Sequence, residues 1–308
     1  MKGHRTDEEH STREFLGRSA QLGAAGLATV TLGASAAESA PLSPWKIGIY
    51  TRPWDKLDYR AAFDAIAAAG YTYAGLMTTN NKEHLVISAK TTPEEASKVA
   101  EELTQRGLLV PSVYGGGIPV HESLEAGIAG MRTLIDNCAT VKAENLLMGG
   151  IGDEKLYALY YKAIAETCDY AAEKGIGISV KPHGGLNATG PQCRKTVEET
   201  VGHKNFRIWY DPGNIYYYSD GELSPVDDAA TVDGLIVGMC VKDYVHPKKV
   251  DVTPGDGMVD FAKVLARLKQ GGFTKGALVV ECLTPGDEAH LLAEAKRARE
   301  FVEQLVAK

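Results

Sequence analysis

The sequence predicts an α/β fold, a single-domain (β/α)8 TIM barrel preceded by an N-terminal signal-like segment. Short apolar runs alternate with helical stretches eight times after residue 44. The apolar runs are continuous rather than alternating, which is typical of parallel strands buried on both faces. Eight consecutive strand–helix units favour a closed barrel over an open doubly wound sheet. No linker or internal repeat divides the region, so we expect one domain over residues 45–306.

The eight predicted strands are short and rich in aliphatic and β-branched residues. They span residues 46–51, 71–77, 108–114, 143–149, 176–182, 206–211, 235–243 and 277–283. The clearest predicted helices span residues 59–69, 92–106, 122–138, 155–173 and 286–306. The second of these has a strong start signal, because Thr92 caps it, Pro93 occupies its first turn and two glutamates follow beside the helix dipole.

Residues 1–40 differ in kind from the rest and predict an export signal. The stretch Ser11–Leu16 resembles a twin-arginine motif in which Thr12 replaces the first arginine, and a small-residue, weakly apolar run follows. Ala34–Ala36 forms an A-x-A pattern, which is typical of a signal cleavage site. We therefore expect an exported, periplasmic protein. A disordered tail on a cytoplasmic protein is the alternative, because three acids at positions 7–9 offset much of the positive charge.

Composition argues against several classes of function. The 308 residues are 44% hydrophobic and 24% charged, with a formal net charge of −7. This acidic balance and the scattered basic residues argue against a nucleic-acid partner. No apolar run after residue 40 is long enough for a membrane span. Five widely spaced cysteines do not make a disulfide framework, and the glycines at 115–117 lack the spacing of a dinucleotide loop.

Polar side chains gather at the carboxyl ends of the predicted strands, where barrels of this kind place their chemistry. The residues at these ends include Arg52, Trp54, Tyr114, Lys181, His183, Asp211, Asn214, Cys240, Lys242, Asp243 and Glu281. A single charged residue there is often part of an ion pair that closes the barrel, since burying an isolated charge costs several kcal/mol. Convergence from four strands favours a functional site instead.

Four motifs, WYDPGN, CVKDY, TPGDGMVDF and VVECL, occur in this order. Together they resemble the xylose isomerase-like TIM-barrel family, which includes sugar-phosphate isomerases and epimerases, and the resemblance covers about residues 45–306. It implies a divalent metal held by a glutamate, an aspartate, a histidine and a second glutamate from consecutive late strands. Asp211 matches the aspartate and Glu281 the final glutamate. Lys181 stands at the first glutamate, and Cys240 stands at the histidine.

These departures leave two interpretations of the site open. In one, a divalent ion (Mn, Mg, Co or Zn) is bound by His183, Asp211 and Glu281, and Lys181 beside it acts as an acid, a base or a substrate-binding donor. In the other, no metal is bound and the ammonium of Lys181 supplies its charge between the two carboxylates. Asn214 also replaces the family histidine that follows the aspartate.

The resemblance implies an enzyme that acts on a small-molecule carbohydrate by moving a proton beside a carbonyl, as sugar isomerases and epimerases do. The catalytic candidates are Lys181, Asp211 and Glu281. The substrate-binding candidates are Arg52, Trp54, Tyr114, Asn214, Lys242 and Asp243, of which the last alternatively orients Lys242. An exported enzyme is expected to act on an unphosphorylated sugar, because sugar phosphates are kept inside cells. A keto-glycoside lyase, which shares the first step, and a barrel that binds sugar without turnover are the alternatives.

Overall fold

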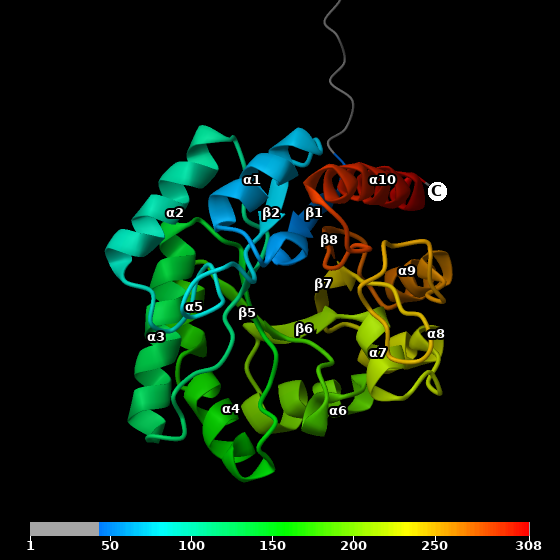
Figure 1. The fold of residues 1–308 in the computed structure, drawn as a ribbon. Coiled ribbons are helices and arrows are strands. Elements are labelled where there is room, and N and C mark those ends of the chain that lie inside the picture. The colour runs from blue at the N-terminus through cyan, green and yellow to red at the C-terminus, as the bar shows by residue number, and fades with distance from the viewer. Residues whose placement is uncertain (1–42, 308) are drawn as a thin grey trace, which may run out of the picture. The chain divides into compact units, whose positions relative to one another are not determined.

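Eight parallel strands form the centre of residues 43–307, the part of the chain that this computed structural model describes (Figure 1). They are β1 (Trp45–Tyr50), β2 (Tyr73–Gly75), β3 (Val113–Tyr114), β4 (Asn145–Met148), β5 (Gly177–Val180), β6 (Phe206–Tyr210), β7 (Ile236–Val241) and β8 (Gly276–Val280). Each lies inside or within one residue of its predicted run. The predicted export signal over residues 1–40 lies outside the described residues.

The strands pair in the order β2-β1-β8-β7-β6-β5-β4-β3. Two isolated parallel bridges, from Tyr73 to Leu109 and from Leu76 to Val113, join the two ends of this order. Beside them the backbone N–H of Leu76 donates to the carbonyl of Ser112 at 3.0 Å. The ring of strands is therefore closed, and the predicted (β/α)8 barrel is confirmed. Because the strands are parallel, their carboxyl ends meet on one face.

Helices surround the ring of strands on its outside (Figure 1). They are α1 (Tyr59–Ala68), α2 (Pro93–Gln105), α3 (Leu124–Thr140), α4 (Tyr157–Ala165), α5 (Cys168–Glu173), α6 (Gly190–Lys195), α7 (Pro212–Tyr218), α8 (Pro225–Ala229), α9 (Phe261–Gln270) and α10 (Glu288–Val306). Among the described residues, none of these helices is both long enough and apolar enough for a bilayer span.

The start of α2 follows the sequence prediction. The hydroxyl of Thr92 accepts the N–H of Glu95 at 3.3 Å, and the Glu95 carboxylate accepts the N–H of Thr92 at 2.8 Å. This reciprocal pair satisfies two N–H groups that the first helical turn leaves without a partner. Loss of such a cap typically costs about 1 kcal/mol of stability.

The predicted helix over residues 155–173 is wrong, because the chain breaks there into α4 and α5. At the break, the buried hydroxyl of Thr167 donates to the carbonyl oxygens of Ala163 and Ile164, at 3.1 and 2.9 Å. A threonine side chain that bonds the preceding turn in this way competes with the regular backbone ladder and bends a helix. The apolar period runs through both halves, so the pattern alone predicts one helix.

Side chains pointing inward from several strands fill the interior of the barrel. One buried cluster consists of Tyr50, Met77, Leu147, Trp209, Cys240, Ala277 and Val279. Since its members come from most of the way round the ring, they face the barrel axis rather than the helices. Cys240 also contacts the charged residues described below, so this packed layer lies directly beneath the candidate site.

Candidate active site

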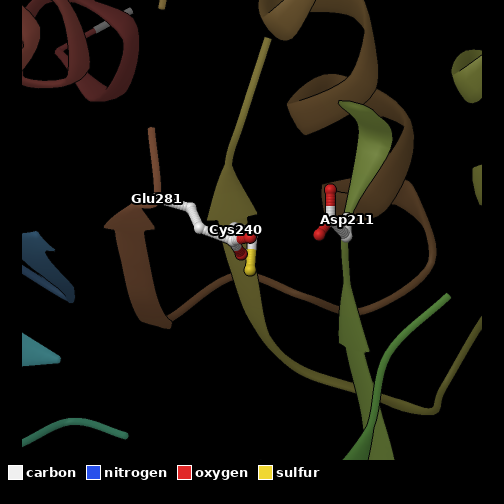
Figure 2. A group of neighbouring side chains, drawn as sticks. All are labelled: Asp211, Cys240 and Glu281. Carbon is white, nitrogen blue, oxygen red and sulfur yellow. The ribbon is translucent and has the colours of Figure 1, made fainter. Parts of the chain in front are cut away.

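Two lysines and two acids meet where β5 to β8 end. Lys181 follows β5, Asp211 follows β6, Lys242 follows β7 and Glu281 follows β8. All four side chains are buried, with at most 3% of each residue exposed. Figure 2 shows two of them, Asp211 and Glu281, with Cys240 on the strand between. The convergence predicted from the strand ends is therefore present in the fold.

Lys181 links the two carboxylates. Its Nζ donates to Glu281 Oε2 at 2.7 Å and to Asp211 Oδ2 at 3.1 Å, and it lies 4.0 Å from the sulfur of Cys240. Burial alone would lower the pKa of Lys181, but the neighbouring negative charges outweigh it and raise that pKa well above its ordinary value. Lys181 is thus a fixed positive charge at neutral pH, which does not suit the predicted role of a general base.

Lys242 and Arg52 bring two more positive charges to Glu281. Lys242 Nζ lies 2.9 Å from Glu281 Oε1 and 3.9 Å from Asp211 Oδ2. Arg52 Nη1 lies 2.7 Å from the same Glu281 oxygen, and its Nη2 lies 3.6 Å from Asp251. Burial would raise the pKa of Glu281, yet these cations and Lys181 hold it well below its usual range.

Positive charges outnumber negative charges around the two buried carboxylates. Three cations, Lys181, Lys242 and Arg52, surround the two buried carboxylates, Asp211 and Glu281. The balancing sixth charge, Asp251, stands at the surface with 59% of its side chain exposed. The sequence reasoning did not single out Asp251. The four buried side chains balance one another, and Arg52, with 30% of its side chain exposed, adds the unbalanced positive charge that attracts an electron-rich oxygen.

The WYDPGN motif explains how Asp211 and Asn214 are positioned. Asp211 is the N-cap of α7, and its Oδ1 accepts the N–H of Asn214 at 3.0 Å. The Asn214 amide donates to the carbonyl of Pro182 at 2.7 Å, and its Oδ1 accepts from Lys242 at 2.9 Å. A Cβ on Gly213 would lie 2.6 Å from the Lys242 carbonyl oxygen, so only glycine allows this approach. We interpret Asn214, predicted to bind substrate, as the residue that positions Lys242.

Asp243 organises a loop. Its carboxylate accepts four backbone N–H groups at 2.8–3.1 Å, those of Tyr244, Gly255, Gly257 and Val259. A Cβ on Gly257 would lie 2.2 Å from an Asp243 oxygen, which accounts for the second glycine of TPGDG. Both oxygens of this fully buried carboxylate are engaged, so its predicted contact with substrate is replaced by a structural role.

Two of the predicted aromatic contacts differ in their surroundings. Trp54 is only 2% exposed and belongs to the main hydrophobic core, so burial leaves little of its ring for a sugar to stack on. Tyr114 is half-buried, and the Nζ of Lys181 lies 5.8 Å from the centre of its ring. Tyr114 is therefore the predicted aromatic residue that borders the cluster.

His183 lies apart from the carboxylates. Its backbone N–H donates to the carbonyl of Asn187 at 2.8 Å, and Gly184 follows with a φ of +86°, so a turn begins directly after His183. The imidazole is open to solvent between two rings, Tyr114 and Tyr218, at centroid distances of 6.3 and 5.9 Å.

Partial desolvation, and then the charges of Lys181 and Lys242, lower the pKa of His183 to about 3. Since the ring stays exposed, solvent screens part of this effect, and the direction is what matters: the imidazole is neutral at neutral pH.

The metal site predicted from His183, Asp211 and Glu281 is not formed. Among residues 43–307, the group of ligand atoms that lie within 4.8 Å of one another is Asp211, Cys240 and Glu281 (Figure 2). Geometry alone would accommodate an ion there. Burial, however, raises the pKa of Cys240 well above its ordinary value, so an ion would have to displace the thiol proton in order to bind the sulfur.

The surrounding charges oppose a divalent ion more strongly. A dication about 4 Å from a single ammonium is repelled by about 8 kcal/mol at an effective dielectric constant near 20, and the carboxylates that would offset this repulsion are already paired with ammonium groups. Both Lys181 and Lys242 contact the carboxylates that such an ion would use. The donor set of this chain, folded in this way, therefore does not fit a divalent metal.

A cavity of about 480 Å³ adjoins the cluster. Arg52 and Trp54 line it from the loop after β1, and Cys282, Leu283 and Pro285 line it from the loop after β8. Arg52 also bonds Glu281, so this guanidinium connects the cavity with the buried charges.

The comparisons place this geometry in a family. Residues 63–305 match the family described as xylose isomerase-like TIM barrel. No curated protein matches the chain. A solved D-psicose 3-epimerase, in the presence of D-fructose, is 15% identical with a TM-score of 0.67, over 85% of this chain and 100% of that chain. A D-psicose 3-epimerase with D-tagatose from Clostridium cellulolyticum H10 is 15% identical with a TM-score of 0.67, over 85% and 99%.

A xylose isomerase domain protein from Planctomyces limnophilus is 18% identical, with a TM-score of 0.65, over 85% of this chain and 97% of that chain. At these identities the likeness shows a shared fold. The family match covers nearly the whole closed barrel, from α1 to α10, and all four strand ends that build the site. The chain therefore belongs to the xylose isomerase-like TIM barrel family.

Proposed function

We propose that the protein is a carbohydrate isomerase or epimerase that moves a proton at a carbon beside a carbonyl group. The observation that carries this proposal is the cluster of three cations, two buried lysines and the half-buried Arg52, around the two buried carboxylates Asp211 and Glu281. Membership of the family supports it, as do solved neighbours named D-psicose 3-epimerase and L-ribulose 3-epimerase. Removing a proton beside a carbonyl creates a negatively charged enediolate, and a site that carries positive charge in advance stabilises that charge.

The residues divide the work by charge. The ammonium groups of Lys181 and Lys242 serve as donors to the substrate oxygen that becomes negative. Asp211 and Asn214 hold those two lysines in place. Glu281 accepts the proton from carbon. Its pKa is low in the resting site, but its proton affinity rises when the enediolate takes over part of the positive charge that now surrounds it.

We propose an unphosphorylated sugar as substrate and an exported location for the enzyme. The signal-like residues 1–40 support the location, and sugar phosphates are not released from cells. The rim of the site agrees with an uncharged substrate. Arg52 already bonds Glu281 and lies near Asp251. The other cation that lines the cavity, Lys56, stands there with four acids, Asp55, Asp251, Asp287 and Glu288. A phosphate would therefore meet an excess of negative charge.

The cavity supports a keto-glycoside lyase as the second candidate. Elimination begins with the same proton removal and then expels a group from the next carbon. The cavity beside Arg52 has room for such a leaving group, and Leu283 and Pro285 give it an apolar wall.

Deuterium exchange tests both candidates. Purified protein is incubated in deuterated water with a panel of ketoses, aldoses and keto-glycosides, and the products are followed by NMR. An isomerase or epimerase introduces deuterium at the carbon beside the carbonyl, and a lyase in addition releases the second sugar or aglycone. Binding of a sugar without any exchange would show a non-catalytic barrel and overturn the proposal.

A further inference from the structure

We propose that Lys181 is a built-in substitute for a divalent metal ion, and that its ammonium holds Asp211 and Glu281 together and meets the substrate oxygen. The contact with a sugar oxygen rests on the proposed function. The replacement of the metal does not, because it concerns the charges of the chain itself.

The contacts of Lys181 are those expected of a central cation. Its Nζ lies 2.7 Å from a Glu281 oxygen and 3.1 Å from an Asp211 oxygen, and these two residues stand on strands separated by β7. The side chain reaches this point from a third strand, β5, with 1% of it exposed. Two carboxylates that would otherwise repel each other are thereby joined by one buried charge.

Cys240 makes room for this lysine. It lies on β7, between the strands that carry Asp211 and Glu281 (Figure 2), and its sulfur is 4.0 Å from the Lys181 ammonium. It is fully buried against Trp209 and Leu147 in the interior layer. An imidazole here would extend into the volume that the lysine head occupies, so the small thiol and the long lysine are a matched pair. A change at one position therefore calls for a change at the other.

Lys242 completes the arrangement at the other oxygen of Glu281. Its ammonium bonds the second Glu281 oxygen at 2.9 Å and is fixed by Asn214. Arg52 bonds that same oxygen and Lys181 bonds the other, so both oxygens of Glu281 contact a cation without any metal ion. The negative charges of Glu281 and Asp211 are therefore already compensated by side chains of the protein.

The decisive measurement is the metal content of the full chain. Protein is dialysed against Mn²⁺, Co²⁺, Zn²⁺ or Mg²⁺, passed through a desalting column and assayed by elemental mass spectrometry. We expect the parent chain to retain less than about 0.1 ion per molecule, since a site filled by an ammonium offers hard cations no free carboxylate. About one tightly held ion per parent chain would overturn the inference.

Two variants test the inference by a gain of metal binding. Lys181→Glu adds a third carboxylate, and Lys181→Glu with Cys240→His restores the family ligand set. We expect the double variant to retain about one ion per chain, with affinity at least about 100-fold above the parent. The control is Lys275→Glu, the same charge change at an exposed residue just before β8, which should bind no more than the parent. Parent-like metal content in the folded double variant would count against the inference.

The design separates this inference from the proposed activity. If a variant misfolds without metal, the parent measurement still decides the question, because it needs no substitution. Calorimetric titration of the parent with Mn²⁺ is a second readout, and no heat of binding is expected. Deuterium exchange by a metal-free parent would support both proposals. Exchange that depends on added metal would overturn the inference alone, and no exchange in a metal-free parent would overturn only the proposed function.

Discussion

The side-chain oxygen of Asn214 accepts a hydrogen bond from the ammonium of Lys242 at 2.9 Å, while its amide donates to the loop that follows β5. One residue at the start of α7 therefore ties together the two strand ends that carry the lysines. A neutral side chain in this position fixes the ammonium without cancelling its charge.

Asn214→Ala is expected to lower the deuterium-exchange rate by about 10-fold, because Lys242 loses its fixed direction, and to cost about 1–3 kcal/mol of stability from the unpaired buried groups. Exchange by NMR and urea denaturation measure the two effects. Asn80→Ala is the matched control, since that exposed amide also donates to one backbone carbonyl. Equal effects of the two substitutions would show that Asn214 does not position Lys242 for the reaction.

Glu281→Gln is expected to abolish exchange and to destabilise the fold by about 3–5 kcal/mol, because three cations lose the carboxylate that they share. Asp211→Asn should cost less stability, since Asp211 contacts one ammonium closely and keeps its capping role as an amide. Simple repulsion between the two acids would predict that both changes stabilise. Urea denaturation distinguishes these outcomes, and a gain of stability in Glu281→Gln would contradict the ion network.

Asp243→Asn is expected to lower stability by about 2–3 kcal/mol, because one of its two acceptor oxygens becomes an N–H donor facing backbone N–H groups. Proteolysis should then cut the loop over residues 253–259 faster. Asp55→Asn, at an exposed position, is the control. An intact loop and parent-like melting temperature in Asp243→Asn would restore the possibility of a substrate contact.

Stability should depend on pH at both ends. The pKa of Glu281 is lowered below its ordinary 4.5, because cations outweigh its burial, so its contribution is present above pH 4.5 and is lost as pH falls through the lowered value. The pKa of Lys181 is raised above 10.5, because the carboxylates outweigh its burial, so its contribution is present below pH 10.5 and is lost as pH rises through the raised value. Urea midpoints from pH 3 to 11 should show this plateau. In Lys181→Met, the urea midpoint should fall less between pH 10.5 and 11 than it does in the parent, because the titrating ammonium is gone.

Deleting residues 1–40 is expected to leave the melting temperature of the barrel nearly unchanged, because residues 43–307 contain the closed ring and its helices. Differential scanning calorimetry of the full and shortened chains measures this. A large drop would assign the segment a structural role, and fractionation of cells that express each form would show whether it directs export.

The positions of the site residues follow from the sequence better than their roles do. Parallel topology brings every strand end to one face, so the meeting of Lys181, Asp211 and Glu281 is predictable from three apolar runs. The direction of a side chain beyond a strand depends on the next turn. The imidazole of His183 lies exposed between two tyrosine rings, and no pattern of apolar residues reports that placement.

Hydrogen bonding decides the remaining roles. In the sequence Asp243 is one more charged residue at a strand end, but the N–H of its neighbour Tyr244 and three N–H groups from a later loop bind its carboxylate. Those partners lie up to 16 residues away, and only the folded path of the loop brings them together. The break at Thr167 likewise depends on which carbonyl its hydroxyl reaches.

The strands of the barrel are paired less extensively at the junction between β2 and β3 than between β1 and β8. Isolated bridges close the ring there, whereas β1 and β8 are paired over five successive residues. Amide protons beside Leu76 and Val113 should therefore exchange with solvent sooner than those of β7 and β8, through openings that need not unfold the whole domain. The two lysines and two carboxylates of the site lie on the arc from β5 to β8, opposite this junction in the order of strands. A local opening at this junction would therefore leave the buried charges of the site assembled.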